Sequence, residues 1–116
     1  MKEYQIQIKL INYLKQKKLS KLRFFHIPNQ GVRSIKYKML LAKMGMKSGC
    51  PDLILEFKGG KMVYIELKTQ KGSLSKSQKL WQNVSNALKT PHYILKGEIN
   101  DLFIQLNNII TKHYET

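Results

Sequence analysis

Asp52, Glu66 and Lys68 are the residues whose types and spacing could do chemistry, because a Pro-Asp pair is followed further along the chain by Glu-Leu-Lys. Two carboxylates offer hard oxygen ligands for Mg²⁺ or Mn²⁺, and such ions bridge to substrate phosphates. The ion polarises a phosphoryl oxygen and acidifies a bound water, while a nearby lysine can orient that water or stabilise developing charge. These side chains suggest a metal site that acts on a polyanion.

The rest of the chain is strongly basic. Its 116 residues include 21 Lys and Arg but only 7 Asp and Glu, for a formal net charge of +14. Acidic residues are absent from Tyr4 to Pro51 and again from Leu67 to Gly97. Such stretches can bind phosphates and release counterions, so nucleic acid is the favoured polyanion. The same lysines could simply solubilise a protein surface, and composition alone leaves both interpretations open.

Length and composition predict one domain that spans residues 1–116. Apolar residues make up 42% of the chain, which is typical of a globular protein. Apolar runs are too short to span a bilayer, and the first residues do not resemble a secretory signal. The single cysteine, Cys50, excludes an intrachain disulfide and a cysteine-based zinc site. We therefore expect an intracellular, cytoplasmic protein of a bacterial or host cell, without a membrane partner.

Apolar periodicity and capping signals predict alternating helices and strands. The expected elements are a helix at 3–18, a strand at 22–27, a helix capped by Ser34 and closed by Gly45, strands at 52–57 and 62–68, a helix opened by the capping box Ser75-x-x-Gln78, a strand at 92–95 and a helix from about Asn100. The order α-β-α-β-β-α-β-α indicates an α/β fold in which helices cover a single mixed sheet.

Hairpin parity predicts that the chemically interesting side chains share one face. Leu53, Leu55 and Phe57 alternate on one strand, as do Val63, Ile65 and Leu67 on the next. Both apolar sets can face the same core only if the numbers of two residues paired across the hairpin add up to an even number. Examples are 57 with 63 and 53 with 67. That parity needs an odd-length loop or a bulge, for which Gly59-Gly60 is suited. The chosen register places Asp52 opposite Lys68, with Glu66 on the same face.

A simpler interpretation is a cross-strand salt bridge between Lys68 and Asp52 or Glu66. Pairs of this kind are common and contribute only about 0.2–1 kcal/mol. The combination of Pro51-Asp52, the hairpin parity and the basic surroundings favours the metal site over that interpretation.

Five strings in the chain carry a family resemblance. They are EYQIQ at 3–7, PNQGVR at 28–33, GMKSGCPDL at 45–53, IELK at 65–68 and GSLSKSQ at 72–78. In this order and spacing they resemble a stand-alone VRR-NUC domain, of phage, viral or bacterial type, within the PD-(D/E)XK nuclease superfamily. Gln30 stands where that family usually has glycine, a mild variation in the loop. The resemblance implies a restriction-endonuclease-like fold.

The resemblance also implies an activity and the residues that perform it. The activity is Mg²⁺- or Mn²⁺-dependent hydrolysis of phosphodiester bonds in DNA, leaving 5′-phosphate and 3′-hydroxyl ends. Asp52, Glu66 and the backbone carbonyl of Leu67 would bind the metal, with Glu3 reaching it through water. Lys68 would orient or activate the attacking water, and the family's conserved glutamine beside the site corresponds to Gln78.

The expected partner is branched or duplex DNA. Small stand-alone members of the family resemble archaeal Holliday-junction resolvases and act as homodimers, so structure-selective cleavage in replication, recombination or repair is implied here. The residues expected to contact nucleic acid are Asn29, Gly31, Arg33, Lys36, Lys47, Lys71 and Lys76.

Several of these residues have simpler roles available. Glu3 near a helix start would favour the helix dipole, and Gln78 is accounted for by its capping box. Glu56 is expected to pair with Lys58 or Lys61 at the surface.

Three alternatives to the DNA endonuclease also stay open. The chain could be a catalytically idle nucleic-acid-binding module of the same fold or a structural basic protein, for example one associated with the ribosome. Hydrolysis of RNA in place of DNA is the third.

Overall fold

The computed structural model describes residues 1–27, 34–45 and 47–114. The elements are α1 (Glu3–Lys17), β1 (Leu22–Phe25), α2 (Ile35–Lys43), β2 (Leu53–Phe57), the 3₁₀ turn η1 (Lys58–Gly60), β3 (Lys61–Lys68), α3 (Lys76–Ala87), β4 (His92–Lys96) and α4 (Ile99–His113). Apart from the short turn η1, this is the predicted element order.

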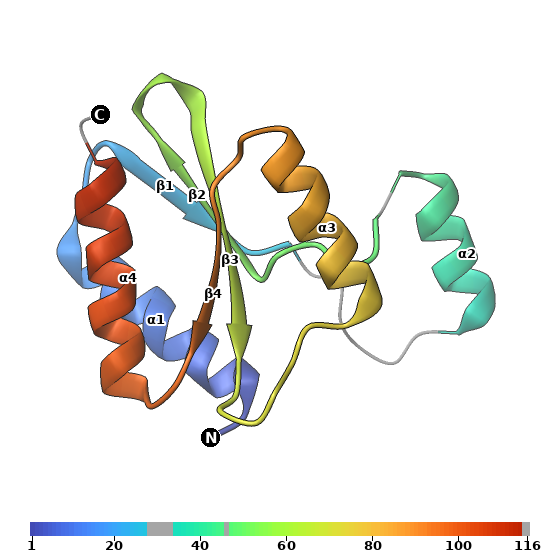
Figure 1. Ribbon diagram of the computed structural model, residues 1–116, viewed down its shortest axis with the longest axis horizontal. Coiled ribbons are helices and arrows are strands. Elements are labelled where there is room, and N and C mark those ends of the chain that lie inside the picture. Colours follow the sequence, from blue (N-terminus) through green and yellow to red (C-terminus); the bar gives the residue numbers. More distant parts are fainter. Residues whose placement is uncertain (28–33, 46, 115–116) are drawn as a thin grey trace.

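The described strands form one mixed sheet in the order β1-β2-β3-β4. β1, β2 and β3 are antiparallel neighbours, and β4 runs parallel to β3. Figure 1 shows α1 and α4 side by side on one face of the sheet and α3 on the opposite face, with α2 standing away from the main body. The α3 helix is the crossover that a parallel β3–β4 pair requires. The predicted helix-covered mixed sheet is thus confirmed.

The core lies between the sheet and the helices α1 and α4. One side of each helix is buried, and every apolar residue predicted to alternate inward on β2 and β3 is buried as well. The buried core residues are Ile6, Leu10, Leu14, Leu53, Leu55, Phe57, Val63, Ile65, Leu67, Leu95, Leu102, Leu106, Ile109 and Ile110. This packing anchors the strands that carry Asp52 and Glu66.

The predicted parity of the β2–β3 hairpin is right, but the predicted register is wrong by two residues. Phe57 pairs with Lys61 and Leu53 with Ile65, not with 63 and 67. The connection η1 has only three residues, an odd number as expected. Gly59 and Gly60, with φ values of 80° and 75°, allow this tighter turn. Continuing the ladder places Asp52 opposite Glu66 and not opposite Lys68.

The helices α2 and α3 leave apolar side chains uncovered. The α3 helix turns Trp81 and Ser85 toward the sheet, where Trp81 meets the Tyr64 ring edge-on at 5.8 Å. Leu80 and Leu88 lie on its outer side and are 64% and 71% exposed. On α2 the exposed apolar residues are Ile35, Tyr37, Met39 and Leu40, followed by Met44 after the helix. No helix among the described residues has the length and apolar content needed to cross a membrane.

Candidate active site

Asp52 and Glu66 lie side by side at the end of the β2–β3 hairpin, and both are buried, with exposed fractions of 5% and 1%. Asp52 Oδ2 accepts a 2.7 Å hydrogen bond from the backbone N–H of Leu67. In an antiparallel pair the N–H and C=O of one residue point toward the same neighbouring strand. The Leu67 carbonyl therefore faces the side on which Asp52 lies.

Lys68 and Glu3 complete the charged cluster. Lys68 Nζ lies 4.0 Å from Glu66 Oε1, and its side chain is only 11% exposed. Glu3 enters from the first turn of α1. Its pKa is raised, chiefly by burial, while the nearby charge of Lys68 lowers it and that of Asp52 raises it. The structure thus brings these four predicted residues together.

Gln78 contacts the cluster directly from the first turn of α3. Its Nε2 donates a 2.7 Å hydrogen bond to Glu66 Oε1. Its Oε1 accepts from the Ser75 N–H at 2.9 Å, while its own backbone N–H donates to Ser75 Oγ at 3.2 Å. The predicted capping box is therefore present, and it also orients the amide toward Glu66. The capping role and the predicted place beside the site are compatible.

Burial gives the Glu66 carboxyl an unusually high proton affinity. Its pKa is raised from 4.5 to about 8 by burial first, then by the charge of Asp52 and by a hydrogen bond with Asp52, against the opposing effect of Lys68. Two carboxylates can share such a hydrogen bond only when one of them is protonated. Glu66 Oε2 is buried and has no hydrogen-bond partner among the described residues. A proton or a cation is needed there.

The donors present suit a hard divalent cation. The described residues contain no cluster of three or more His, Cys, Asp and Glu side chains that could hold a metal by themselves. Mg²⁺ and Mn²⁺ need fewer, because they keep several waters and accept one or two carboxylates together with substrate phosphate. The uncompensated Glu66 oxygen, the adjacent Asp52 carboxylate and the Leu67 carbonyl fit that pattern.

Residues that sequence reasoning did not assign to the site hold it in place. The ring of His26 contacts the Asp52 carbonyl through Nδ1 at 2.8 Å, at the point where the chain leaves β1. Gly49 has φ +80°, and a Cβ on it would lie 2.9 Å from Gln78 N and still closer to the Ser77 carbonyl. The glycine just before Cys50-Pro51-Asp52 was the available sequence signal. It lets the loop before β2 pack directly on the start of α3.

Comparison with known proteins identifies a family and a similar fold. The family model of the VRR-NUC domain matches residues 1–97. The chain belongs to the VRR-NUC domain family. A solved structure described as a VRR_NUC domain protein superposes with a TM-score of 0.75 at 19% identity, covering 99% of this chain and 93% of that one. At that identity the likeness concerns the fold. A search of curated proteins found no match.

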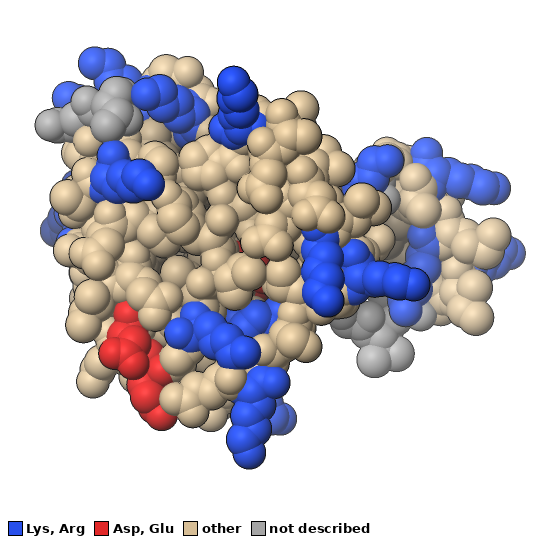
Figure 2. Space-filling model, viewed as in Figure 1, with Lys and Arg blue, Asp and Glu red and all other residues tan. Residues whose placement is uncertain are grey.

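The residues of this VRR-NUC domain predicted to bind nucleic acid lie in several places. Lys71 lies in the loop that follows β3, and Lys76 begins α3. Lys47 is exposed and lines a groove with Ser77 and Trp81 of α3, and Lys36 is exposed on α2. Figure 2 shows Lys and Arg atoms spread over this whole face of the molecule, α2 included. The predicted loop residues Asn29, Gly31 and Arg33 lie outside the described residues.

Glu56 has a cross-strand partner that the sequence did not suggest. It pairs with Arg23, whose Nη2 lies 2.5 Å from Glu56 Oε1. The reason is that β1 pairs with β2 and sets Arg23 directly across from Glu56. In this VRR-NUC domain Glu56 is thus a carboxylate on β2 that pairs with Arg23 of β1 and lies outside the candidate site.

Proposed function

We propose that this chain is a single nuclease domain, residues 1–116, that hydrolyses phosphodiester bonds in DNA with Mg²⁺ or Mn²⁺. The observation that carries the proposal is the buried Glu66 carboxylate, held against Asp52 and Gln78 with one oxygen uncompensated. Membership of the VRR-NUC family supports nuclease chemistry. The net charge of +14 supports a polyanionic substrate.

Each charged residue has a defined part in the proposed reaction. Asp52, Glu66 and the Leu67 carbonyl hold the metal, and Glu3 contributes through water. The bound metal supplies positive charge to the phosphate and acidifies a water. Lys68, close to Glu66 and shielded from solvent, orients the attacking water and stabilises the charge that develops on the phosphate. Gln78 fixes the direction of the Glu66 carboxylate.

The test compares two carboxylates: Asp52, which directly precedes β2, and Glu56, which lies on β2. Asp52→Asn removes a proposed metal ligand, whereas Glu56→Gln removes a carboxylate that pairs with Arg23 away from the site. Purified protein is incubated with end-labelled junction, flap, duplex and single-stranded DNA, with Mg²⁺, Mn²⁺ or EDTA. We expect cleavage by the wild type and Glu56→Gln only with metal, and background cleavage by Asp52→Asn. Equal cleavage by Asp52→Asn and the wild type would refute the proposal.

The preferred substrate is proposed to be branched DNA, as the stand-alone family resemblance implies. Such a substrate presents two symmetric strands, and a homodimer presents two matching sites. The exposed apolar residues on the outer side of α3 offer a surface for self-association. A groove beside α3 is lined by Leu80, Trp81, Val84 and Leu88 of that helix together with Tyr64 of β3.

A further inference from the structure

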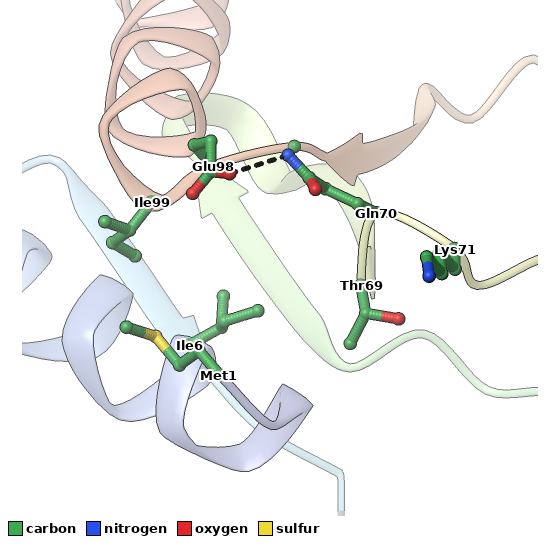
Figure 3. A pocket seen from close by; sticks show the side chains of 8 residues that line it. Met1, Ile6, Thr69, Gln70, Lys71, Glu98 and Ile99 are labelled. Atoms are coloured by element: carbon green, nitrogen blue, oxygen red, sulfur yellow. Dashed lines mark hydrogen bonds between the residues drawn. The ribbon is translucent and has the colours of Figure 1, made fainter.

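A pocket lies where β3 ends, one residue along the chain from Lys68. It has a volume of about 320 Å³ and is lined by Met1, Ile6, Thr69, Gln70, Lys71, Gly97, Glu98 and Ile99. Figure 3 shows Met1, Ile6 and Ile99 grouped on one side of it. The hydrogen bond from Gln70 Nε2 to Glu98 Oε1, 2.9 Å long, runs along another side. The lining therefore combines an apolar floor with a polar wall.

The pocket and the active site share two parts of the fold, the start of α1 and the end of β3. Thr69 directly follows Lys68 at the end of β3, and Ile6 lies one helical turn from Glu3 on α1. The loop after β3 folds back on the catalytic lysine, since a Cβ on Gly72 would lie 3.4 Å from Lys68 Cδ. The pocket lining therefore begins one residue after Lys68, which the proposed function sets at the phosphate.

The loop that forms the pocket is held in place before any ligand arrives. The Gly72 N–H donates to the Thr69 carbonyl at 2.9 Å, which closes a tight turn. Lys96 Nζ, at the end of β4, donates to the Gly72 carbonyl at 2.6 Å. A preformed cavity loses less conformational freedom on binding than a flexible loop does.

The polar wall selects against phosphate and for hydrogen-bond donors. An ionised Glu98 accepts hydrogen bonds and repels a phosphate, and the Gln70 amide oxygen is also an acceptor. Figure 2 shows carboxylate atoms gathered near the start of α4, next to basic side chains. Lys71 lines the same pocket and can bind a backbone phosphate. This arrangement suits a neutral group that carries N–H donors, with its phosphate at Lys71.

We propose that this pocket binds an unstacked nucleobase with an exocyclic amino group, next to the scissile phosphate. The proposal rests on the proposed nuclease function and names the feature of the DNA that it selects. Carboxylates accept from the cytosine amino group, and extruded bases are read along their Watson–Crick edges. Thymine lacks such an amino group. A nucleotide near a junction or flap leaves its stack more readily than one in a continuous duplex.

The first measurement uses flap substrates in which one nucleotide at a time around the cut is replaced by an abasic tetrahydrofuran residue. We expect one position at which the replacement lowers kcat/KM roughly tenfold. At that position thymine should behave like the abasic residue, and cytosine, adenine or guanine should be preferred. Equal rates for every abasic position would overturn the proposal.

Variants then connect that position to the pocket. Glu98→Gln keeps the size of the side chain and removes its charge, so the ratio between amino-bearing bases and thymine should fall toward one. Ile99→Trp fills the cavity and should abolish the difference between base and abasic residue. Glu56→Gln, the same chemical change at a distant carboxylate, should keep the wild-type ratio. An unchanged ratio in Glu98→Gln, with normal folding by circular dichroism, would refute the assignment.

A binding readout separates this proposal from the nuclease proposal. With 2-aminopurine at the sensitive flap position, and at each neighbouring position in turn, its fluorescence is followed as protein is added in EDTA. Insertion into the pocket should unstack the base and change its fluorescence in the wild type but not in Ile99→Trp. If no DNA is cut with any metal, the nuclease proposal fails while this measurement still decides the pocket. An identical response of both proteins at every position would overturn the pocket proposal.

Discussion

Gln78 on α3 donates a 2.7 Å hydrogen bond to Glu66 on β3, and this contact ties a helix cap to a candidate metal ligand. The same amide accepts from the Ser75 backbone, so the capping box determines where its nitrogen points. The local signal that starts α3 is thereby also a part of the site.

Replacing Gln78 and Ser75 separately should distinguish the capping of α3 from the contact with Glu66. Gln78→Ala removes the contact to Glu66 and should weaken Mn²⁺ binding about 10–100-fold, as for other groups that orient a metal ligand. Ser75→Ala removes one cap hydrogen bond, costing about 1 kcal/mol of stability, and leaves the Gln78–Glu66 contact in place. Titration calorimetry with Mn²⁺ and urea unfolding measure the two effects. Equal loss of Mn²⁺ affinity in both variants would contradict this division.

Gly49 should be needed for the same contact, for a steric reason. A Cβ at Gly49 would collide with the backbone of Ser77 and Gln78, whereas a Cβ at Gly59 would meet nothing within 4 Å. Both glycines have φ +80°, so alanine at either carries a backbone cost of roughly 1–2 kcal/mol. Only Gly49→Ala should displace the start of α3 and weaken Mn²⁺ binding and cleavage. Similar activities of the two variants at matched temperature would argue against this.

Without metal, the protein should lose stability as the pH rises. The pKa of Glu66 is about 8 when folded and near 4.5 when unfolded. Between these values the folded chain binds more protons than the unfolded chain, so the free energy of unfolding falls with increasing pH. This contribution is complete below about pH 4.5 and is lost through pH 8.

Urea unfolding in EDTA from pH 7 to 8.5 measures this fall. His92 and His113 do not disturb that range, because burial lowers their pKa values below 6.5. Glu66→Gln should flatten the dependence and stabilise the metal-free protein at pH 8.5, while Glu56→Gln should keep it. A flat wild-type profile would show that Glu66 is ionised at neutral pH.

Leu88 should contribute to self-association if the groove on α3 is the dimer surface. Leu88 is 71% exposed at this groove, and Ile104, on α4, is 60% exposed elsewhere. Leu88→Lys should shift the protein toward monomer in light scattering coupled to size-exclusion chromatography, and Ile104→Lys should not. A monomeric wild type at micromolar concentration would instead remove the basis for the dimer.

The sequence by itself determined which residues have the right chemistry and on which face of the sheet they lie. Side chains alternate strictly along a strand, so burying Leu53, Leu55 and Phe57 leaves Asp52 on the opposite face whatever the exact register. The capping box at Ser75 could also be recognised in the sequence, because it depends on two residues only three positions apart. Local periodicity therefore predicted the helices and strands and the sheet face that Asp52, Glu66 and Lys68 share.

The tertiary structure decided the contacts within that face. The register depends on how tightly Gly59-Gly60 turn, and a three-residue connection brings Asp52 opposite Glu66 and not Lys68. The partner of Glu56 depends on β1, which is distant in sequence. The outward position of Leu80 and Leu88 depends on which side of α3 meets Tyr64. Each of these follows from packing between separate segments, which the spacing within one segment does not encode.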